Sequence, residues 1–314
     1  MAKKPKQTFK RALPILGILI AAEVVLLLSQ LVRGKDVALL QPAGTIAAQQ
    51  KDLIVFASVL SLFVIVPVFV LLGFILWRYR DGNVKAKYRP NWDSNRTLES
   101  IWWGLPMIII LILAVVTWKT SHSLDPFRAL DSKTKPLTVQ VVALQWKWLF
   151  IYPEQNIATV NYLQIPEDTP INFKITADAP MNSFWISKLG GQIYAMTGME
   201  TKLHLMADQP GTYRGMSANI SGEGFAEMNF EVVSSTRADF DTWVDATRQS
   251  PTSLTKDMYA QLTKPNKDQP VVLYASRDLD LYSTVMMKYM GSHSHATTHK
   301  PAEIDHSGHY MEGQ

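Results

Sequence analysis

Five histidines near the C-terminus form the densest group of side chains in this sequence that could bind a metal ion. Together with one methionine they are His293, His295, His299, His306, His309 and Met311. Imidazole and thioether groups bind copper or zinc, so this tail could capture such an ion weakly. The polar composition of residues 291–314 favours the simpler interpretation, a disordered tail without a metal.

The sequence contains no cysteine, which excludes disulfides, thiolate metal sites and thiol nucleophiles together. Its hydrophobic residues are 47% of the chain, but most long apolar runs precede Trp118. We therefore expect a membrane part followed by a soluble part. The formal charge of +4 comes from Lys and Arg that cluster beside the apolar runs, which indicates membrane orientation rather than binding to an anionic partner such as nucleic acid.

Two apolar segments, residues 53–77 and 101–118, are candidates for membrane-spanning helices. Each can cross a hydrocarbon core of roughly 30 Å at about 1.5 Å per residue. The loop between them is rich in Lys and Arg, and an excess of basic residues marks the cytoplasmic side. The soluble part is therefore expected in the periplasm, attached to a bacterial inner membrane.

A third apolar run, residues 13–31, follows several basic residues and is typical of a signal sequence or a membrane anchor. No clear cleavage site follows it directly, so we expect an uncleaved anchor. Glu23 lies inside the run, where an ionised side chain costs roughly 3 kcal/mol at the bilayer centre. It could pair with another subunit or lie near the interface.

Beyond residue 135, short β-type runs recur and are separated by turns rich in Pro and Gly. The runs are residues 137–144, 157–165, 171–176, 202–206 and 228–233. They predict an all-β Greek-key sandwich. Ser234 and Ser235 could then cap a helix that places Phe240, Trp243 and Val244 on one face, and residues 279–290 could form a second short helix.

These patterns divide the chain into five parts. They are a signal sequence or anchor (1–35), a transmembrane helical hairpin (36–120) with a cytoplasmic loop (78–100), a periplasmic β domain (121–234), a helical appendix (235–290) and the His-rich tail (291–314).

Four motifs stand at the start of the second apolar segment and within the β region. They are LESIWWGLP at 98–106, QWKWLFIY at 145–152, NSFWI at 182–186 and GTYRG at 211–215. With the order of the parts, they resemble subunit II of the haem-copper respiratory oxidases over residues 53–233, and the cytochrome bo-type ubiquinol oxidases most of all. The resemblance implies a cupredoxin-like fold for the β domain.

In the members of this family that oxidise cytochrome c, the domain binds a dinuclear copper centre through two Cys, two His, one Met and a Glu main-chain oxygen. The resemblance places Asn182 and Phe225 at the His positions, Ser217 and Ser221 at the Cys positions, Asn219 at the Glu and Met228 at the Met. A Ser hydroxyl is a poor copper ligand and Phe is none, so we expect no metal here. We expect Trp146, Trp148 and Phe150 to pack against subunit I.

The resemblance therefore implies subunit II of a proton-translocating ubiquinol oxidase that binds no cofactor itself. The haems, one copper and the quinol site are expected in subunit I, which this chain would cap on the periplasmic side. The other expected partners are small membrane subunits and lipid, but not cytochrome c. Glu99 matches a family carboxylate at a proton-channel entrance; alternatively it is a solvated residue in the first turn of a helix.

Two alternatives remain. A cytochrome c oxidase subunit II shares the architecture but requires the Cys pair that this sequence lacks. A non-enzymatic, membrane-anchored periplasmic binding or assembly protein has no motif in its favour.

Overall fold

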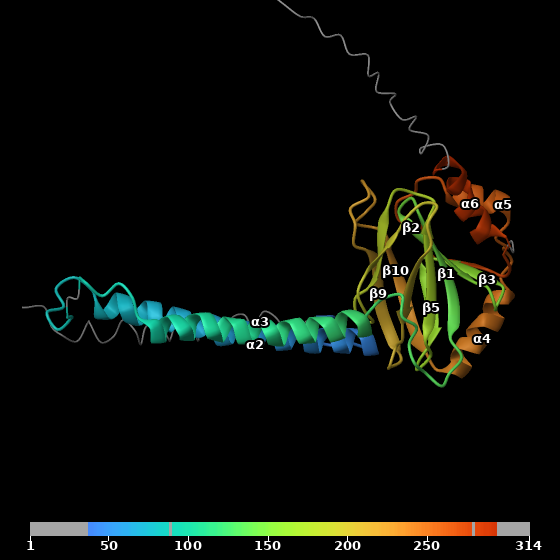
Figure 1. The fold of residues 1–314 in the computed structure, drawn as a ribbon. Helices are drawn as coiled ribbons and strands as arrows, with labels where there is room; N and C mark the ends of the chain where they lie inside the picture. The colour runs from blue at the N-terminus through green and yellow to red at the C-terminus, as the bar shows by residue number, and fades with distance from the viewer. Residues whose placement is uncertain (1–36, 88–89, 278–279, 294–314) are drawn as a thin grey trace, which may run out of the picture.

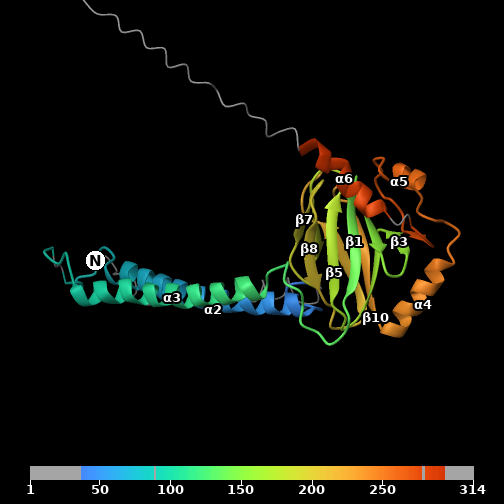
Figure 2. The ribbon, with the colours of Figure 1, turned by 45° about the vertical axis from the view of Figure 1, so that its right-hand side comes forward.

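The computed structural model describes residues 37–87, 90–277 and 280–293. Within them a long helical hairpin leads into a β-sandwich that carries short helices at its side (Figures 1 and 2). The predicted anchor at residues 13–31 with Glu23, and the tail after His293, lie outside the described residues.

The hairpin consists of α2 (Thr45–Arg78) and α3 (Arg96–Ser123), which lie side by side (Figures 1 and 2). Both are long and apolar enough to cross a membrane. Each extends beyond the predicted apolar run, because polar residues continue the helix at its ends. Asn95 caps α3 by accepting a hydrogen bond from the Leu98 N–H at 3.1 Å.

The first turn of α2 is tied to the sandwich. The Ala43 N–H donates to the Lys188 carbonyl at 2.9 Å, and the Ala47 N–H donates to the Leu189 carbonyl at 3.1 Å. A Cβ at Gly44 would lie 2.5 Å from the main-chain oxygen of Met206 in the sandwich, so the close approach requires glycine. The helix therefore begins in direct contact with the β domain.

Two sheets form the sandwich, as the sequence predicts. The first contains, in spatial order, β11 (Val272–Tyr274), β3 (Ile157–Val160), β2 (Lys147–Tyr152), β1 (Leu137–Leu144), β5 (Ile171–Ala177) and β8 (Thr201–Leu205). The second contains β4 (Tyr162–Pro166), β10 (Asn229–Ser235), β9 (Gly211–Ser217), β6 (Asn182–Ile186) and β7 (Ile193–Ala195). Strands β1 and β5 pair in parallel, as do β4 and β10, and the other neighbouring strands pair antiparallel.

The predicted single strand at residues 157–165 is wrong, since β3 and β4 belong to different sheets. The chain turns at Asn161, whose φ of 54° lies in the left-handed region that Asn tolerates. Its side-chain oxygen accepts from the Trp148 N–H at 2.8 Å, and its amide donates to the Gln269 carbonyl at 2.9 Å. These bonds hold the corner that passes the chain between the sheets.

An aromatic cluster fills the space between the sheets. Trp148 and Phe150 on β2 contact Phe184 on β6 and Phe230 on β10, and the last two rings stack at 5.3 Å. The first two side chains are completely buried. Our expectation that Trp148 and Phe150 pack against subunit I is therefore wrong, because both belong to the core of this domain.

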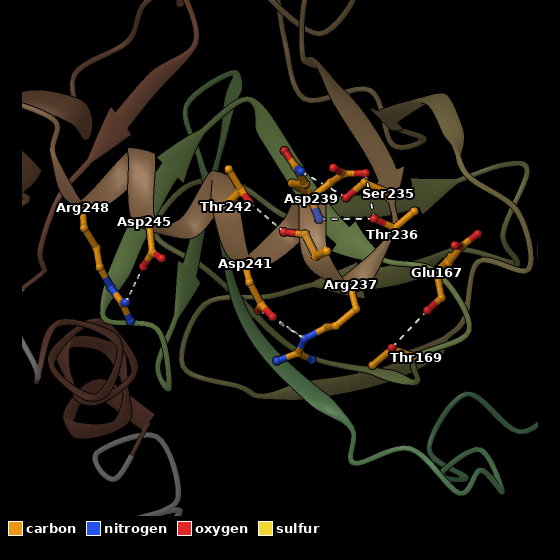
Figure 3. A network of polar contacts seen from close by, with 12 residues as sticks. Glu167, Thr169, Ser235, Thr236, Arg237, Asp239, Asp241, Thr242, Asp245 and Arg248 are labelled. Carbon is orange, nitrogen blue, oxygen red and sulfur yellow. Dashed lines mark hydrogen bonds and ion pairs between the residues drawn. The ribbon is translucent and has the colours of Figure 1, made fainter.

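Helix α4 (Arg237–Arg248) begins one residue later than predicted. Strand β10 continues through Ser235, so Thr236 is the cap, and its hydroxyl accepts from the Asp239 N–H at 3.2 Å (Figure 3). Phe240 and Val244 are buried against the sandwich, as expected for the apolar face. Helix α6 (Leu281–His293) matches the second predicted helix, whereas α5 (Lys256–Leu262) was not predicted.

Candidate functional site

The six positions matched to copper ligands come together at one end of the sandwich. We call them the degenerate cluster; they are Asn182, Ser217, Asn219, Ser221, Phe225 and Met228. Asn182 begins β6, Ser217 ends β9, and the others lie on the connection to β10. The Ser217 N–H donates to the Met228 carbonyl at 3.1 Å, which brings both ends of this connection together.

Polar side chains of the degenerate cluster form hydrogen bonds with one another and with the main chain just before Asn182. The Ser217 hydroxyl donates to the Asn182 side-chain oxygen at 3.0 Å, and both residues are buried. The Asn182 amide donates to the Pro180 carbonyl at 2.7 Å, and the Asn219 amide donates to the Met181 carbonyl at 2.8 Å. The side chains of Asn182, Ser217 and Asn219 are therefore engaged in neutral hydrogen bonds. The degenerate cluster contains neither a thiolate nor an imidazole, so its side chains do not fit a copper centre.

Trp146 covers the β9–β10 connection. Its φ of 62° is unusual for a bulky residue and costs on the order of 1–3 kcal/mol, which surrounding contacts must offset. The indole N–H donates to the Ser221 carbonyl at 3.2 Å. A Cβ at Gly224 would lie 2.4 Å from the Trp146 ring, so only glycine allows this packing. The strained conformation places the ring against Ser221, Gly222 and Gly224 of this connection.

A buried carboxylate lies next to the degenerate cluster. Asp178 follows β5, and its side chain, 1% exposed, accepts hydrogen bonds from Tyr259 of α5 at 2.7 Å, from Lys288 of α6 at 2.7 Å and from Tyr289. We call these four residues the Asp178 cluster. It joins α5 and α6 to Asp178, which lies four residues before Asn182, so the helical appendix is attached at the start of the loop that leads into the degenerate cluster.

Alkaline pH should release the appendix. Burial raises the pKa of the Tyr259 hydroxyl, and the hydrogen bond to Asp178 raises the pKa of the Lys288 ammonium. A group with a raised folded pKa stabilises the fold fully below its unfolded value and loses that contribution as the pH rises through the folded value. We expect α5 and α6 to unfold only above about pH 10, with phenolate absorbance and helical circular dichroism changing together.

A tyrosine elsewhere provides the control for this titration. Tyr194 on β7 is 49% exposed, and Tyr194→Phe should leave the alkaline midpoint unchanged, whereas Tyr259→Phe should move it. Ionisation of the Tyr259 hydroxyl near its ordinary pKa, with both helices intact, would contradict the role assigned to the Asp178 cluster.

Glu99 lies in the first turn of α3, and α3 begins at the end of the hairpin that is distant from the sandwich (Figure 1). Its carboxylate accepts a hydrogen bond from the Asn95 N–H at 3.1 Å, while Asn95 accepts from the Leu98 N–H. This reciprocal capping satisfies two amides that the helix leaves without partners. The carboxylate therefore has a structural task at the helix start, in addition to any role in proton uptake.

Sequence reasoning missed two buried charged residues. One is Asp178; the other is Lys147 on β2, which is 1% exposed. The Lys147 ammonium donates to the Leu262 and Lys264 carbonyls at 3.0 and 2.9 Å, and burial lowers its pKa. It thereby satisfies carbonyls at the end of α5. No local pattern marks either residue, because their partners lie about a hundred positions away.

Within the described ranges, no group of three or more His, Asp or Glu is gathered as a metal site. His293 ends α6, and the four later histidines of the tail are outside the described residues. Weak metal capture by the tail therefore stays a prediction.

Two protein families match parts of the chain. Residues 155–235 match a family described as cytochrome C oxidase subunit II, periplasmic domain. Residues 248–293 match a family described as COX aromatic rich motif, and they contain Tyr259, Lys288 and Tyr289 of the Asp178 cluster. The two matches thus cover the degenerate cluster and the appendix that is joined to it.

Relatives match most of the chain. The cytochrome bo(3) ubiquinol oxidase subunit 2 of Pseudomonas putida is 44% identical over 302 residues, which are 96% of this chain and 93% of that protein. The ubiquinol oxidase subunit 2 of Acetobacter aceti is 45% identical, over 82% of this chain and 85% of that protein. A quinol oxidase subunit 2 from Bacillus cereus is 44% identical, over 74% and 80%.

Proposed function

This chain belongs to the family of ubiquinol oxidase subunit 2 proteins, and from that membership we propose that it serves its complex as a membrane-anchored subunit without a redox centre. Quinol oxidation and oxygen reduction take place on the partner, subunit I, which holds the haems and one copper. The sandwich caps that subunit on the periplasmic side, and the complex translocates protons.

The observation that carries this proposal is the chemistry of the degenerate cluster. Ser217 and Asn182 bind each other in a buried pair at 3.0 Å, and the Trp146 indole N–H donates to the Ser221 carbonyl of the β9–β10 connection. Soft thiolates and imidazoles hold a dinuclear copper centre, whereas neutral hydroxyl and amide groups do not. Met228 is the one side-chain ligand retained, and it is buried in the hydrophobic core.

The donor of electrons follows from the missing copper. A copper centre in this domain would receive electrons from a soluble carrier outside the membrane. In its absence electrons must reach subunit I from within the bilayer, which is where a lipid-soluble quinol is found. The relatives are ubiquinol and quinol oxidase subunits, which supports a quinol as donor, and the lack of Cys argues against the cytochrome c alternative.

The charge of the hairpin loop supports an orientation for the subunit. The basic residues of the loop between α2 and α3 favour the cytoplasmic side of the bacterial inner membrane, so the outer ends of both helices and the sandwich lie in the periplasm. With this orientation, the chain would consist of the five parts predicted from its sequence.

Oxygen consumption by the purified complex tests the proposal. After mild detergent extraction, the chain should co-purify with a haem-containing subunit, and ubiquinol should support oxygen uptake while reduced cytochrome c should not. Faster oxygen uptake with cytochrome c than with quinol, or purification of the chain without any haem protein, would overturn it.

Glu99→Gln should slow proton-coupled turnover if Glu99 stands at a proton-channel entrance. The Gln side-chain oxygen can still accept from the Asn95 N–H, so the cap of α3 is retained while the ionisable group is lost. We expect a decrease of about tenfold or more in turnover with unchanged thermal stability, in the range of a lost proton-transfer group.

Glu99→Asp and Glu99→Ala complete this test. The aspartate keeps a carboxylate and should retain part of the turnover, and the alanine removes both the carboxylate and its hydrogen bond to the Asn95 N–H, while the Asn95 side chain still caps the helix. Equal turnover in Glu99→Gln and the unchanged chain, with a loss of stability in Glu99→Ala alone, would leave Glu99 with the capping role only.

A further inference from the structure

A cavity of 370 Å³ lies where the outer ends of α2 and α3 meet the sandwich. Its walls come from four separate parts of the chain: the first two turns of α2, the connection that follows α3, the two residues before β7, and the end of strand β8. Figures 1 and 2 show this junction at the base of the hairpin, next to the sheets. The volume is within the range of small-molecule sites.

From the position of the apolar run we place the cavity at the depth of the lipid headgroups. Gln50 in its wall precedes the start of the apolar run at Leu53 by three residues, or about 5 Å along the helix. The polar layer on each side of the hydrocarbon core is roughly 5–8 Å thick. Directly beyond, Ile54 and Val55 of α2 are 47% and 51% exposed, and present an apolar surface along which acyl chains can lie.

Charges of both signs line the cavity. Arg128 contributes a guanidinium, and Asp125 and Asp131 contribute carboxylates, so these three side chains sum to −1. Arg128 and Asp131 form an exposed pair at 3.6 Å, which is weak and can be rearranged by a ligand. The His204 Nδ1 lies 2.9 Å from the Pro126 carbonyl and, since a carbonyl oxygen only accepts, must carry the proton in this contact.

We propose that this cavity binds the headgroup of a zwitterionic phospholipid that ends in a primary amine. The phosphate is paired with Arg128, and the ammonium is paired with Asp125 and Asp131. An ammonium donates hydrogen bonds to both carboxylates, whereas the quaternary amine of a choline headgroup has no N–H to donate. The excess of carboxylates disfavours a headgroup that carries only negative charge.

Native mass spectrometry of the intact complex tests the site. Complexes reconstituted with equal amounts of ethanolamine, choline and glycerol phospholipids should retain the ethanolamine lipid, enriched several-fold over the others. Asp125→Asn with Asp131→Asn should abolish this enrichment. The Asn at 125 can still accept from the Phe127 N–H, so the local turn is kept. Arg128→Gln should weaken retention of ethanolamine and choline lipids alike.

A matched arginine gives the control. Arg237 on α4 also forms an exposed pair with a nearby aspartate, and Arg237→Gln should leave lipid retention unchanged. The proposal is overturned if the enrichment is absent, or if it persists in the Asp125 and Asp131 variant.

Photo-crosslinking identifies the occupant. A benzophenone amino acid in place of Gln49, which lines the cavity and is exposed, should yield an adduct with the mass of a phospholipid. The same amino acid at Thr242 on α4 should not. A crosslink to residues 1–36 of the chain instead of lipid would overturn the proposal, as would equal competition by soluble phosphorylethanolamine, which has no acyl chains to lie along α2.

Discussion

Four substitutions in the degenerate cluster should convert the sandwich into a copper-binding domain. Asn182→His, Phe225→His, Ser217→Cys and Ser221→Cys together restore two imidazoles and two thiolates beside Met228. We expect about two copper ions per chain, since bridging thiolates are what hold such a pair. Metal analysis of the purified variant, with the visible absorption of a copper thiolate, measures the outcome.

Part of the present packing favours this conversion. The Ser217 hydroxyl and the Asn182 side-chain oxygen bind each other, so replacing both residues leaves neither of these two groups unsatisfied, although the Pro180 carbonyl loses the Asn182 amide as its donor. The Ser221 hydroxyl is buried without a hydrogen-bond partner, so a thiol at this position breaks no side-chain bond. The double variant with His at 182 and 225 but no Cys is the control, and should bind no stoichiometric copper.

A four-substitution variant that folds with unchanged thermal stability but takes up no copper would contradict the assignment of these positions. It would mean that the β9–β10 connection, held under Trp146, no longer allows the spacing that a dinuclear centre requires.

Asp178→Ala should detach the helical appendix. The substitution leaves the hydroxyl of Tyr259 and the ammonium of Lys288 without their acceptor, and the tyrosine is largely buried. Removing a buried acceptor from such a network should lower the free energy of unfolding of the appendix by about 2–3 kcal/mol. The loss is smaller than for a fully buried ion pair, because the Lys288 side chain is 54% exposed. Hydrogen exchange in α5 and α6 should accelerate by roughly 30- to 160-fold.

The degenerate cluster should respond as well, because the loop after Asp178 leads directly into Asn182. Exchange of the N–H groups at residues 217–219 should increase, while that at the start of α2 should not. Asp241→Ala serves as the control: Asp241 pairs with Arg237 on an exposed face, and exposed pairs contribute 0–1 kcal/mol. Equal effects of both substitutions would contradict the coupling role of Asp178.

Much of the sandwich follows from the sequence because its strands obey simple patterns. Strand β1 matches residues 137–144 as predicted, since two faces of different burial alternate along its first half. Strand β2 has six buried residues and hence no alternation that could reveal it. The sequence did not reveal the corner at Asn161, because apolar residues continue on both sides of it, although they belong to strands of different sheets.

The candidate site was only partly accessible to sequence reasoning. Comparison with a known family located Asn182, Ser217 and Phe225, but the bond between the first two depends on how β6 and β9 pair. Asp178 and Lys288 are separated by 110 positions. Their contact exists because α6 folds back onto the end of β5, and no local pattern of residues encodes that approach.

The copper content of the intact complex tests the central claim most directly. If the sandwich holds no metal, the purified complex should contain about one copper ion per copy of this chain, the one in subunit I. A content of about three copper ions per copy, with the added pair assigned to the periplasmic domain, would contradict the account.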